Sequence, residues 1–199
     1  MTPQAFYGAA YPKLCAAEQQ LVELIGRCPV ARDSEGREAA VLYCKSRIKS
    51  PESMLDKLEK NGLPPTSCAA LQYMHDAVGV RAVCAFTDDV YRVASWLSAQ
   101  PEIRKTAVKD YIAPPKPNGY RSYHLILALT DGAGAGMTAE VQLRTIAADF
   151  WAALEHQMKY KHTVRHEKLV QDELKRCADE IASVDLSMQT IRELLAEDF

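Results

Sequence analysis

The apolar run VGVRAVCAF at residues 78–86 constrains the fold of this chain more than any other segment. A run of this kind is typical of a central β-strand that is covered on both faces. Arg81 interrupts the run, and a guanidinium inside such a strand is unfavourable unless a carboxylate, a phosphate or an aromatic plane meets it. A bulge or bend at Gly79 would bring Arg81 and Asp76 to one site. The run therefore predicts a layered sheet with a polar site on its central strand.

Segments with helical and strand periodicity alternate on either side of this run. Helices are expected over residues 3–27, 51–60, 88–100 and 146–161, with one or two more over 165–197. Further strands are expected at 40–49, 104–112, 122–130 and 137–144, and the glycine-rich residues 131–136 are interpreted as the hairpin turn before the last strand. The sum is an α/β fold, a mixed sheet of about five strands flanked by helices.

The length and composition exclude several classes of protein. A chain of 199 residues suits one domain with a real core, and a net charge of −2 argues against a sequence-independent nucleic-acid binder. We expect no DNA partner; RNA is not indicated. No apolar run reaches the length of a membrane span, and the first residues lack the pattern of a signal peptide, so a cytoplasmic protein is expected. The six cysteines lie singly, which predicts reduced structural thiols.

Two basic rows follow one another along the chain. Residues 40–49 alternate as a strand, and Ser50 and Pro51 then begin a helix as N-cap and first helical residue. The rows consist of Lys45, Arg47 and Lys49 on the strand, and Ser53, Lys57 and Lys60 on the helix. They form either an anion site or a solvated cationic face. The acids of this helix fall largely off the stripe, which favours an anion site.

The segment KDYIAPPKPNGYRSYH at residues 109–124 is a loop that its prolines stiffen. Strand alternation continued backwards from Leu125 places Tyr120, Ser122 and His124 on one side. A rigid loop with a flat ring, an imidazole and cations suits a planar anionic ligand such as a nucleotide. A proline-rich connector with ordinary surface polar residues is the alternative at this point.

The strand at 137–144 has one apolar face and one polar face, the latter made of Thr138, Glu140, Gln142 and Arg144. The polar face is either solvated or the floor of a site, with Glu140 beside Arg144. Thr145 is expected to cap the next helix, whose core stripe is expected to be Phe150, Trp151, Leu154 and Met158. The histidines at 156, 162 and 166 lack the spacing of a metal-ligand set.

Together, these separate groups of polar and charged residues suit a single ligand site. Asp76 and Glu140 can hold Mg²⁺, the cations can hold a polyphosphate, and phosphoryl transfer needs mostly positioning and charge neutralisation. The motifs SRIKSPESMLDK, DAVGVR, KDYIAPPKPNGYRSYH, EVQLRT and DFWAALEHQMKYK then follow in order over residues 41–161. In these five motifs the chain resembles the synthetase domain of the RelA/SpoT family, and within it the stand-alone small alarmone synthetases, which have a nucleotidyltransferase-like fold.

The resemblance implies a magnesium-dependent transfer of pyrophosphate from ATP to the 3′-hydroxyl of GDP or GTP, with release of AMP. It implies that Arg47 and Arg81 sandwich the adenine, and that Lys49, Ser53 and Lys57 hold the ATP phosphates. It implies that Asp76 binds Mg²⁺, and that Glu140 shares the metal or polarises the attacking hydroxyl. On the acceptor side, Tyr120 would stack on the base; the other implied residues there are Lys116, Asn118, His124, Arg144, Glu155 and His156.

The resemblance also implies a homo-oligomer, a tetramer as in similar small synthetases, formed through the terminal helices. We expect a single synthetase domain over 1–199, with a helical extension at 1–39, a catalytic core at 40–162 and C-terminal helices at 163–199. Lys45 and Ser46 replace small residues beside the place where tetrameric members bind an allosteric alarmone, so that regulation is not expected. Two alternatives stay open, a synthetase with an adenine acceptor and a catalytically silent nucleotide- or RNA-binding relative.

Overall fold

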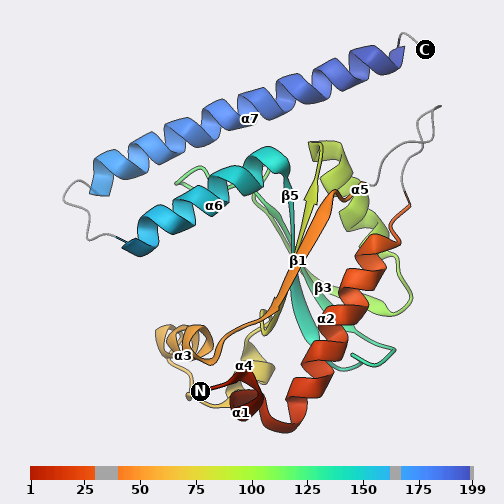
Figure 1. Ribbon diagram of the computed structural model, residues 1–199, viewed down its shortest axis with the longest axis vertical. Helices are drawn as coiled ribbons and strands as arrows, with labels where there is room; N and C mark the ends of the chain where they lie inside the picture. The colour runs from red at the N-terminus through yellow and green to blue at the C-terminus, as the bar shows by residue number, and fades with distance from the viewer. Residues whose placement is uncertain (30–39, 162–166, 198–199) are drawn as a thin grey trace.

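The computed structural model describes residues 1–29, 40–161 and 167–197, and its centre is one five-stranded sheet (Figure 1). Across the sheet the strands lie in the order β1 (Tyr43–Ile48), β2 (Val78–Cys84), β5 (Thr138–Thr145), β4 (Tyr123–Leu129) and β3 (Ile103–Asp110). β2 and β5 pair in parallel, and every other neighbouring pair is antiparallel. The prediction of a mixed sheet flanked by helices is confirmed, and residues 131–136 do connect β4 to its antiparallel neighbour β5.

The helices, in chain order, are α1 (Pro3–Tyr7), the 3₁₀ turn η1 (Gly8–Ala10), α2 (Tyr11–Gly26), α3 (Pro51–Lys60), α4 (Ser67–Tyr73), α5 (Thr87–Ser98), α6 (Ile146–Lys161) and α7 (Glu167–Glu197). The prediction of a single helix over 3–27 is wrong in one respect, because the helix is interrupted at Gly8, whose φ is +54°. Ser50 and Thr145 do act as helix N-caps, accepting hydrogen bonds from the amides of Ser53 and Ala148. Of the one or two helices expected over 165–197, the described residues form one, α7.

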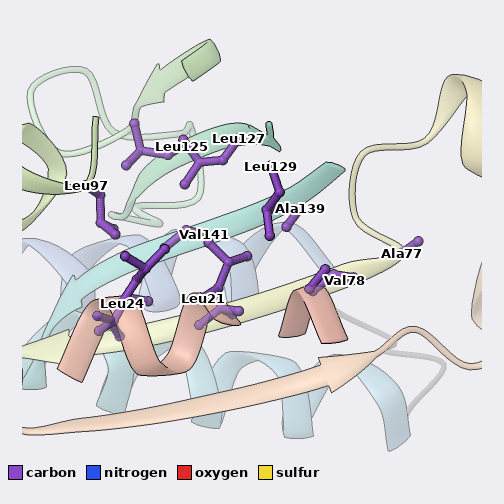
Figure 2. Packing of buried hydrophobic residues seen from close by; sticks show 14 of the residues in the cluster. Leu21, Leu24, Ala77, Val78, Leu97, Leu125, Leu127, Leu129, Ala139 and Val141 are labelled. Atoms are coloured by element: carbon purple, nitrogen blue, oxygen red, sulfur yellow. The ribbon is translucent and has the colours of Figure 1, made fainter. Parts of the chain in front are cut away.

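The apolar core lies on the face of the sheet that α2 and α5 cover (Figure 2). Leu21 and Leu24 of α2 point at Val78 of β2 and Val141 of β5, and all four are fully buried. From α5, Leu97 reaches the same layer and is fully buried too. Burying a side chain of this size stabilises a fold by roughly 1.5–3 kcal/mol, so this layer holds the helices and the strand register together.

The opposite face of the sheet is polar, and two expectations about β2 need correction there. Gly79 and Arg81 are only half-buried on this face, so β2 is not covered on both faces along its whole length. The register of β2 with both neighbours runs without a shift, so Gly79 makes no bulge. A Cβ at Gly79 would lie 3.8 Å from the side chain of Arg47, an ordinary van der Waals contact, so Arg47 packs over this position without requiring a glycine there.

α6 and α7 run side by side beyond the sheet, and their packing corrects a third expectation (Figure 1). Trp151 of α6 is buried against Leu174 and Ala178 of α7, and its indole N–H donates to the Leu174 carbonyl at 2.9 Å. Phe150 and Leu154 are instead exposed, by 57% and 42% of their surface, as is Met158. The predicted core stripe is therefore wrong except at Trp151, because α7 covers only that side of α6.

α7 leaves many apolar side chains uncovered. Those with about half or more of their surface exposed are Leu169, Val184, Leu186, Met188, Ile191, Leu194 and Leu195. Near its end, Arg192 reaches Asp88 in the first turn of α5 at 2.6 Å and lies over the ring of Phe86 at 4.2 Å. In the described parts of the chain, no helix combines the length and the apolar character that crossing a membrane requires.

Candidate active site

The strand register brings the predicted polar residues to one face of the sheet. Gly79 of β2 lies opposite Arg47 of β1 and Glu140 of β5, and Arg81 lies two residues further on the same face. His124 of β4 lies opposite Gln142, on that face too. Paired residues point to the same side of a sheet, so four strands contribute to this polar face.

At the start of β2, Asp76 is held between two lysines. Its Oδ2 atom lies 2.7 Å from Lys49 Nζ and 2.8 Å from Lys57 Nζ. Lys49 follows β1, where its carbonyl accepts a hydrogen bond from Tyr7 at 3.0 Å, and Lys57 stands on α3. Burial raises the pKa of Asp76, but the hydrogen bonds from Lys49 and Lys57 outweigh it and lower the pKa below its usual value. Asp76 is therefore a carboxylate at neutral pH.

The second carboxylate oxygen of Asp76 is open to a ligand. Oδ1 is buried and has no hydrogen-bond partner among the described residues. A buried polar atom without a partner is unfavourable, so Oδ1 marks a position where a cation or a ligand donor would be stabilised. Ser53 lies in the first turn of α3, one turn before Lys57, where Ser50 caps the helix.

Arg81 meets a carboxylate other than the one we expected. Its NH1 lies 3.2 Å from Oδ1 of Asp149, in the first turn of α6, and Asp76 binds the lysines instead. The expectation that Asp76 and Arg81 share a contact is therefore wrong, because Gly79 does not bend the strand. Burial lowers the pKa of Arg81, and the charge of Arg144 lowers it further.

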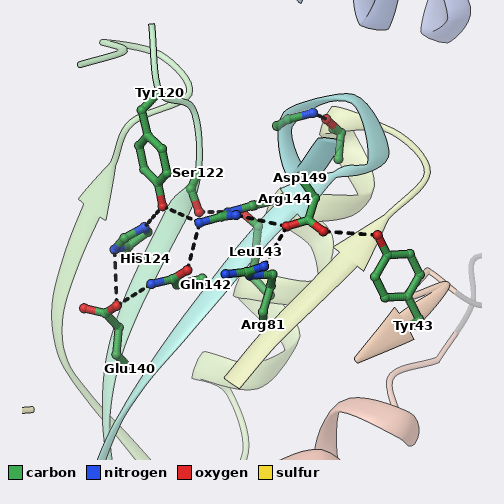
Figure 3. Close-up of polar contacts among 12 residues, drawn as sticks. Tyr43, Arg81, Tyr120, Ser122, His124, Glu140, Gln142, Leu143, Arg144 and Asp149 are labelled. Carbon is green, nitrogen blue, oxygen red and sulfur yellow. Dashed lines mark hydrogen bonds and ion pairs between the residues drawn. The ribbon is translucent and has the colours of Figure 1, made fainter. Parts of the chain in front are cut away.

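Along β5 the side chains of Glu140, Gln142 and Arg144 form a continuous chain of hydrogen bonds (Figure 3). Gln142 donates to Glu140 Oε1 at 2.6 Å and accepts from Arg144 NH2 at 2.9 Å. The expected pair of Glu140 and Arg144 is thus bridged by Gln142. Arg144 is buried and donates through NH1 to Asp149 at 2.9 Å. The polar face of this strand is therefore a partly buried, hydrogen-bonded network rather than a solvated face.

Tyr120 and His124 lead from Arg144 back to the side of Glu140 (Figure 3). Tyr120 accepts a hydrogen bond from Arg144 NH2 at 2.7 Å and shares one with His124 Nε2 at 2.9 Å. Burial lowers the pKa of His124 to about 4, although Glu140 opposes this shift. The imidazole is therefore neutral at pH 7, and its 3.7 Å approach to Glu140 is not an ion pair and is too long for a hydrogen bond.

The proline-rich loop is tied to the two C-terminal helices. Asn118 donates to Glu155 of α6 at 3.1 Å, and its Oδ1 accepts from the Tyr120 amide at 3.2 Å. Gly119 has a φ of +88°, and a Cβ there would lie 2.4 Å from Cβ of Ala178 on α7. Only glycine fits this contact. The loop is a positioned part of the site and not a loose connector.

Lys116 completes the aromatic end of the site. Its ammonium lies 4.5 Å from the centre of the Tyr111 ring and 4.9 Å from that of Tyr120, within cation–π range. The Tyr111 ring also meets His124 edge-on at 5.2 Å. Lys116 is exposed, whereas Tyr120 and Tyr111 are half-buried.

The structure brings most of the predicted residues to these clusters. Arg47, Ser53, Lys116 and His156 are exposed at the surface, and His156 follows Glu155 on α6. Sequence reasoning missed Asp149, Gln142, Tyr43 and Tyr111. Gln142 follows the same alternation of polar residues as Glu140, so the sequence pattern already placed both on one face of the strand. Asp149 was visible only as an acid in the first turn of a helix.

Comparison with known proteins identifies the family. The family described as "Region found in RelA / SpoT proteins" matches residues 46–165. The chain belongs to the RelA/SpoT family. GTP pyrophosphokinase YwaC of Bacillus subtilis (strain 168) is 42% identical over 153 residues, which cover 75% of this chain and 73% of that protein.

Solved structures of RelA/SpoT relatives share the fold. Small alarmone synthetase 1 from Bacillus subtilis, bound to its product pppGpp, matches with a TM-score of 0.82 and 28% identity, over 96% of this chain and 97% of that chain. The same synthetase bound to AMPCPP matches with a TM-score of 0.74 and 26% identity, over 94% and 96%. The resemblance and the fold predicted from sequence are confirmed.

The neutral His124 should make stability depend on pH. Between about pH 4 and 6.5 the unfolded chain protonates this histidine while the folded chain does not, so the free energy of unfolding should fall as pH falls through that window. Asp76 has a lowered pKa in the folded chain, so its contribution to the free energy of unfolding is lost only at pH values below this window. In the His124→Gln variant the free energy of unfolding should fall less between pH 6.5 and 5, as measured by urea denaturation at several pH values. His75→Gln, which removes an exposed imidazole, is the control; an equal change of slope in both variants would contradict the assignment.

Proposed function

We propose that this RelA/SpoT-family protein is a GTP pyrophosphokinase, an alarmone synthetase. It transfers the β,γ-pyrophosphate of ATP to the 3′-hydroxyl of GDP or GTP and releases AMP. The observation that carries the proposal is one polar sheet face with a cationic cluster around Asp76 at one end, an aromatic and arginine cluster at the other, and Glu140 between them. Relatives named GTP pyrophosphokinase and a relative bound to pppGpp support the same activity.

The ATP side is built from the two basic rows. Lys49 and Lys57 carry two positive charges against the single charge of Asp76, so the cluster keeps a net positive charge for phosphates. Ser53 adds a hydroxyl at the start of α3, where the helix dipole favours anions, while its amide donates to Ser50. Arg47 and Arg81 supply planar guanidinium groups for the adenine, since such planes stack on aromatic rings.

The carboxylates fit Mg²⁺. Among the described residues no group of three or more His, Cys, Asp or Glu side chains could hold a metal, but Mg²⁺ usually needs only one or two carboxylates together with substrate phosphates and water. Asp76, with its unpartnered Oδ1 just before β2, and Glu140, opposite Gly79 of β2, would be those carboxylates. When bound, the ion would neutralise charge on the transferred phosphoryl groups.

The acceptor side is built from the proline-rich loop. Tyr120 stacks on the acceptor base, while Lys116, Asn118 and His124 hold the rest of the nucleotide. Because His124 is neutral and buried, it contributes a hydrogen bond rather than a charge. Arg144, Glu155 and His156 support this side, the first through the Tyr120 hydroxyl and the second through Asn118. Glu140 takes the proton from the attacking 3′-hydroxyl, and it would also help to hold Mg²⁺.

The protein works as a cytoplasmic homo-oligomer, and we favour a tetramer. The exposed apolar side chains of α6 and α7 support this, because an apolar surface of that extent is usually covered by a partner. The six free cysteines fit a reducing compartment.

Light scattering should give the mass of more than one chain. Leu186→Glu should lower that mass, because it places a charge in an apolar contact, whereas Ser187→Glu on the neighbouring exposed position should not. A monomeric wild-type mass would contradict the assembly.

The activity is tested with purified protein, ATP, Mg²⁺ and GDP or GTP. AMP and a 3′-pyrophosphorylated guanine nucleotide should form, as separated by ion-exchange chromatography. Glu140→Gln should lower kcat by about 10²- to 10⁴-fold, the usual effect of losing a general base. The variant keeps the size of the side chain, and its circular dichroism spectrum should match that of wild type, which excludes loss of folding as the cause. Absence of both products from folded wild-type protein would refute the proposal.

The role of Tyr120 can be separated from that of the ATP site. Tyr120→Leu should raise the KM for GDP by roughly 5- to 150-fold, because base–aromatic stacking contributes about 1–3 kcal/mol per base, with little change in the KM for ATP. Tyr120→Phe keeps the ring and removes the hydroxyl that contacts Arg144 and His124, so its KM for GDP should stay closer to wild type. Equal KM values for GDP in the leucine variant and in wild type would contradict stacking.

A further inference from the structure

Asp149 is the meeting point of three strands (Figure 3). Its Oδ1 forms an ion pair with Arg81 of β2 at 3.2 Å and accepts from Arg144 of β5 at 2.9 Å, and its Oδ2 accepts from the Tyr43 hydroxyl of β1 at 3.2 Å. The carboxylate is 5% exposed and lies in the first turn of α6, where the helix dipole stabilises a negative charge. A displacement of Asp149 would therefore change its contacts with all three of these side chains.

The two guanidinium groups that share Oδ1 would otherwise repel each other. Burial and the charge of Arg144 both lower the pKa of Arg81. With a single carboxylate between two arginines, the cluster retains one excess positive charge. The Nε atoms of Arg81 and Arg144 are both buried and have no hydrogen-bond partner among the described residues. Each arginine thus has a donor that protein atoms leave open, which is expected of a ligand-binding group.

The two arginines lead to opposite halves of the proposed site. Arg81 is a residue of the ATP side, while Arg144 donates to the Tyr120 hydroxyl and lies 5.1 Å from the centre of the Tyr120 ring. One residue, Arg81, therefore separates Asp149 from the adenine position, and two residues, Arg144 and Tyr120, separate it from the acceptor base. A ligand that draws Arg81 toward itself changes how firmly Asp149 holds Arg144, and through it Tyr120.

We propose that Asp149 is a positioning residue that couples the binding of ATP to the binding of the acceptor nucleotide. This inference rests on the proposed function for the identity of the two nucleotides. Asp149 does not touch either substrate; it holds Arg81 and Arg144 in the arrangement that both nucleotides select. The coupling is reciprocal, so each nucleotide raises the affinity for the other by the same factor.

The test measures this factor directly, by calorimetric titration of AMPCPP into the whole protein with and without saturating GDP. In the wild type GDP should tighten AMPCPP binding by about 5- to 150-fold, the usual range of a coupling between sites. In Asp149→Asn the factor should fall close to one, with a lower kcat. A merely structural defect would instead reduce the number of binding-competent molecules and leave the factor unchanged in the rest.

Asp88→Asn is the matched control, since Asp88 also lies in the first turn of a helix and binds two arginines, Arg92 and Arg192, but lies outside the network. It should keep the wild-type factor. If Asp149→Asn does not fold, Tyr43→Phe replaces it, because it removes only the hydrogen bond to Oδ2 from a side chain at the sheet edge. The coupling factor should then fall by about two- to tenfold, which corresponds to the net free-energy contribution of one hydrogen bond.

The outcomes separate the two proposals. Wild-type protein without coupling, or Asp149→Asn with the wild-type factor, would overturn the role of Asp149 whatever the activity. Nucleotide binding with coupling but no formation of AMP would refute the synthetase function and leave the coupling intact, because the titration needs no turnover.

Discussion

The parallel pairing of β2 with β5 places Gly79 level with Glu140 and Arg81 level with Gln142, and every other contact in the site depends on this register. A slip of one residue would turn Glu140 into the apolar layer under α2 and send Val141 to the polar face. Burial of Val78 and Val141 against α2 excludes that slip. The same packing that stabilises the fold therefore aligns the site.

Each end of the site uses one carboxylate to hold two cations. Asp76 holds Lys49 and Lys57, and Asp149 holds Arg81 and Arg144. Both arrangements leave an excess positive charge in a partly buried setting, where charges are screened less than in water. A protein with a net charge of −2 can in this way present a local site for polyphosphate and nucleotide anions.

The proline-rich loop owes its position to the C-terminal helices. Gly119 packs against Ala178, Arg121 reaches Asp179 at 3.1 Å, and Asn118 is held by Glu155. α7 thus supports the aromatic end of the site as well as carrying an exposed apolar surface. If that surface is where copies of the chain meet, assembly and the geometry of the acceptor side are physically connected through one helix.

The sequence by itself determined the local structure and the composition of the site. Strand alternation placed Glu140, Gln142 and Arg144 on one face, and the caps at Ser50 and Thr145 placed two helix starts, because these signals depend on residues close in the chain. Only the tertiary structure decided which charges meet. Arg81 pairs with Asp149 rather than Asp76, and Phe150 is exposed while Trp151 is buried, because strand register and the path of α7 depend on packing between segments far apart in sequence.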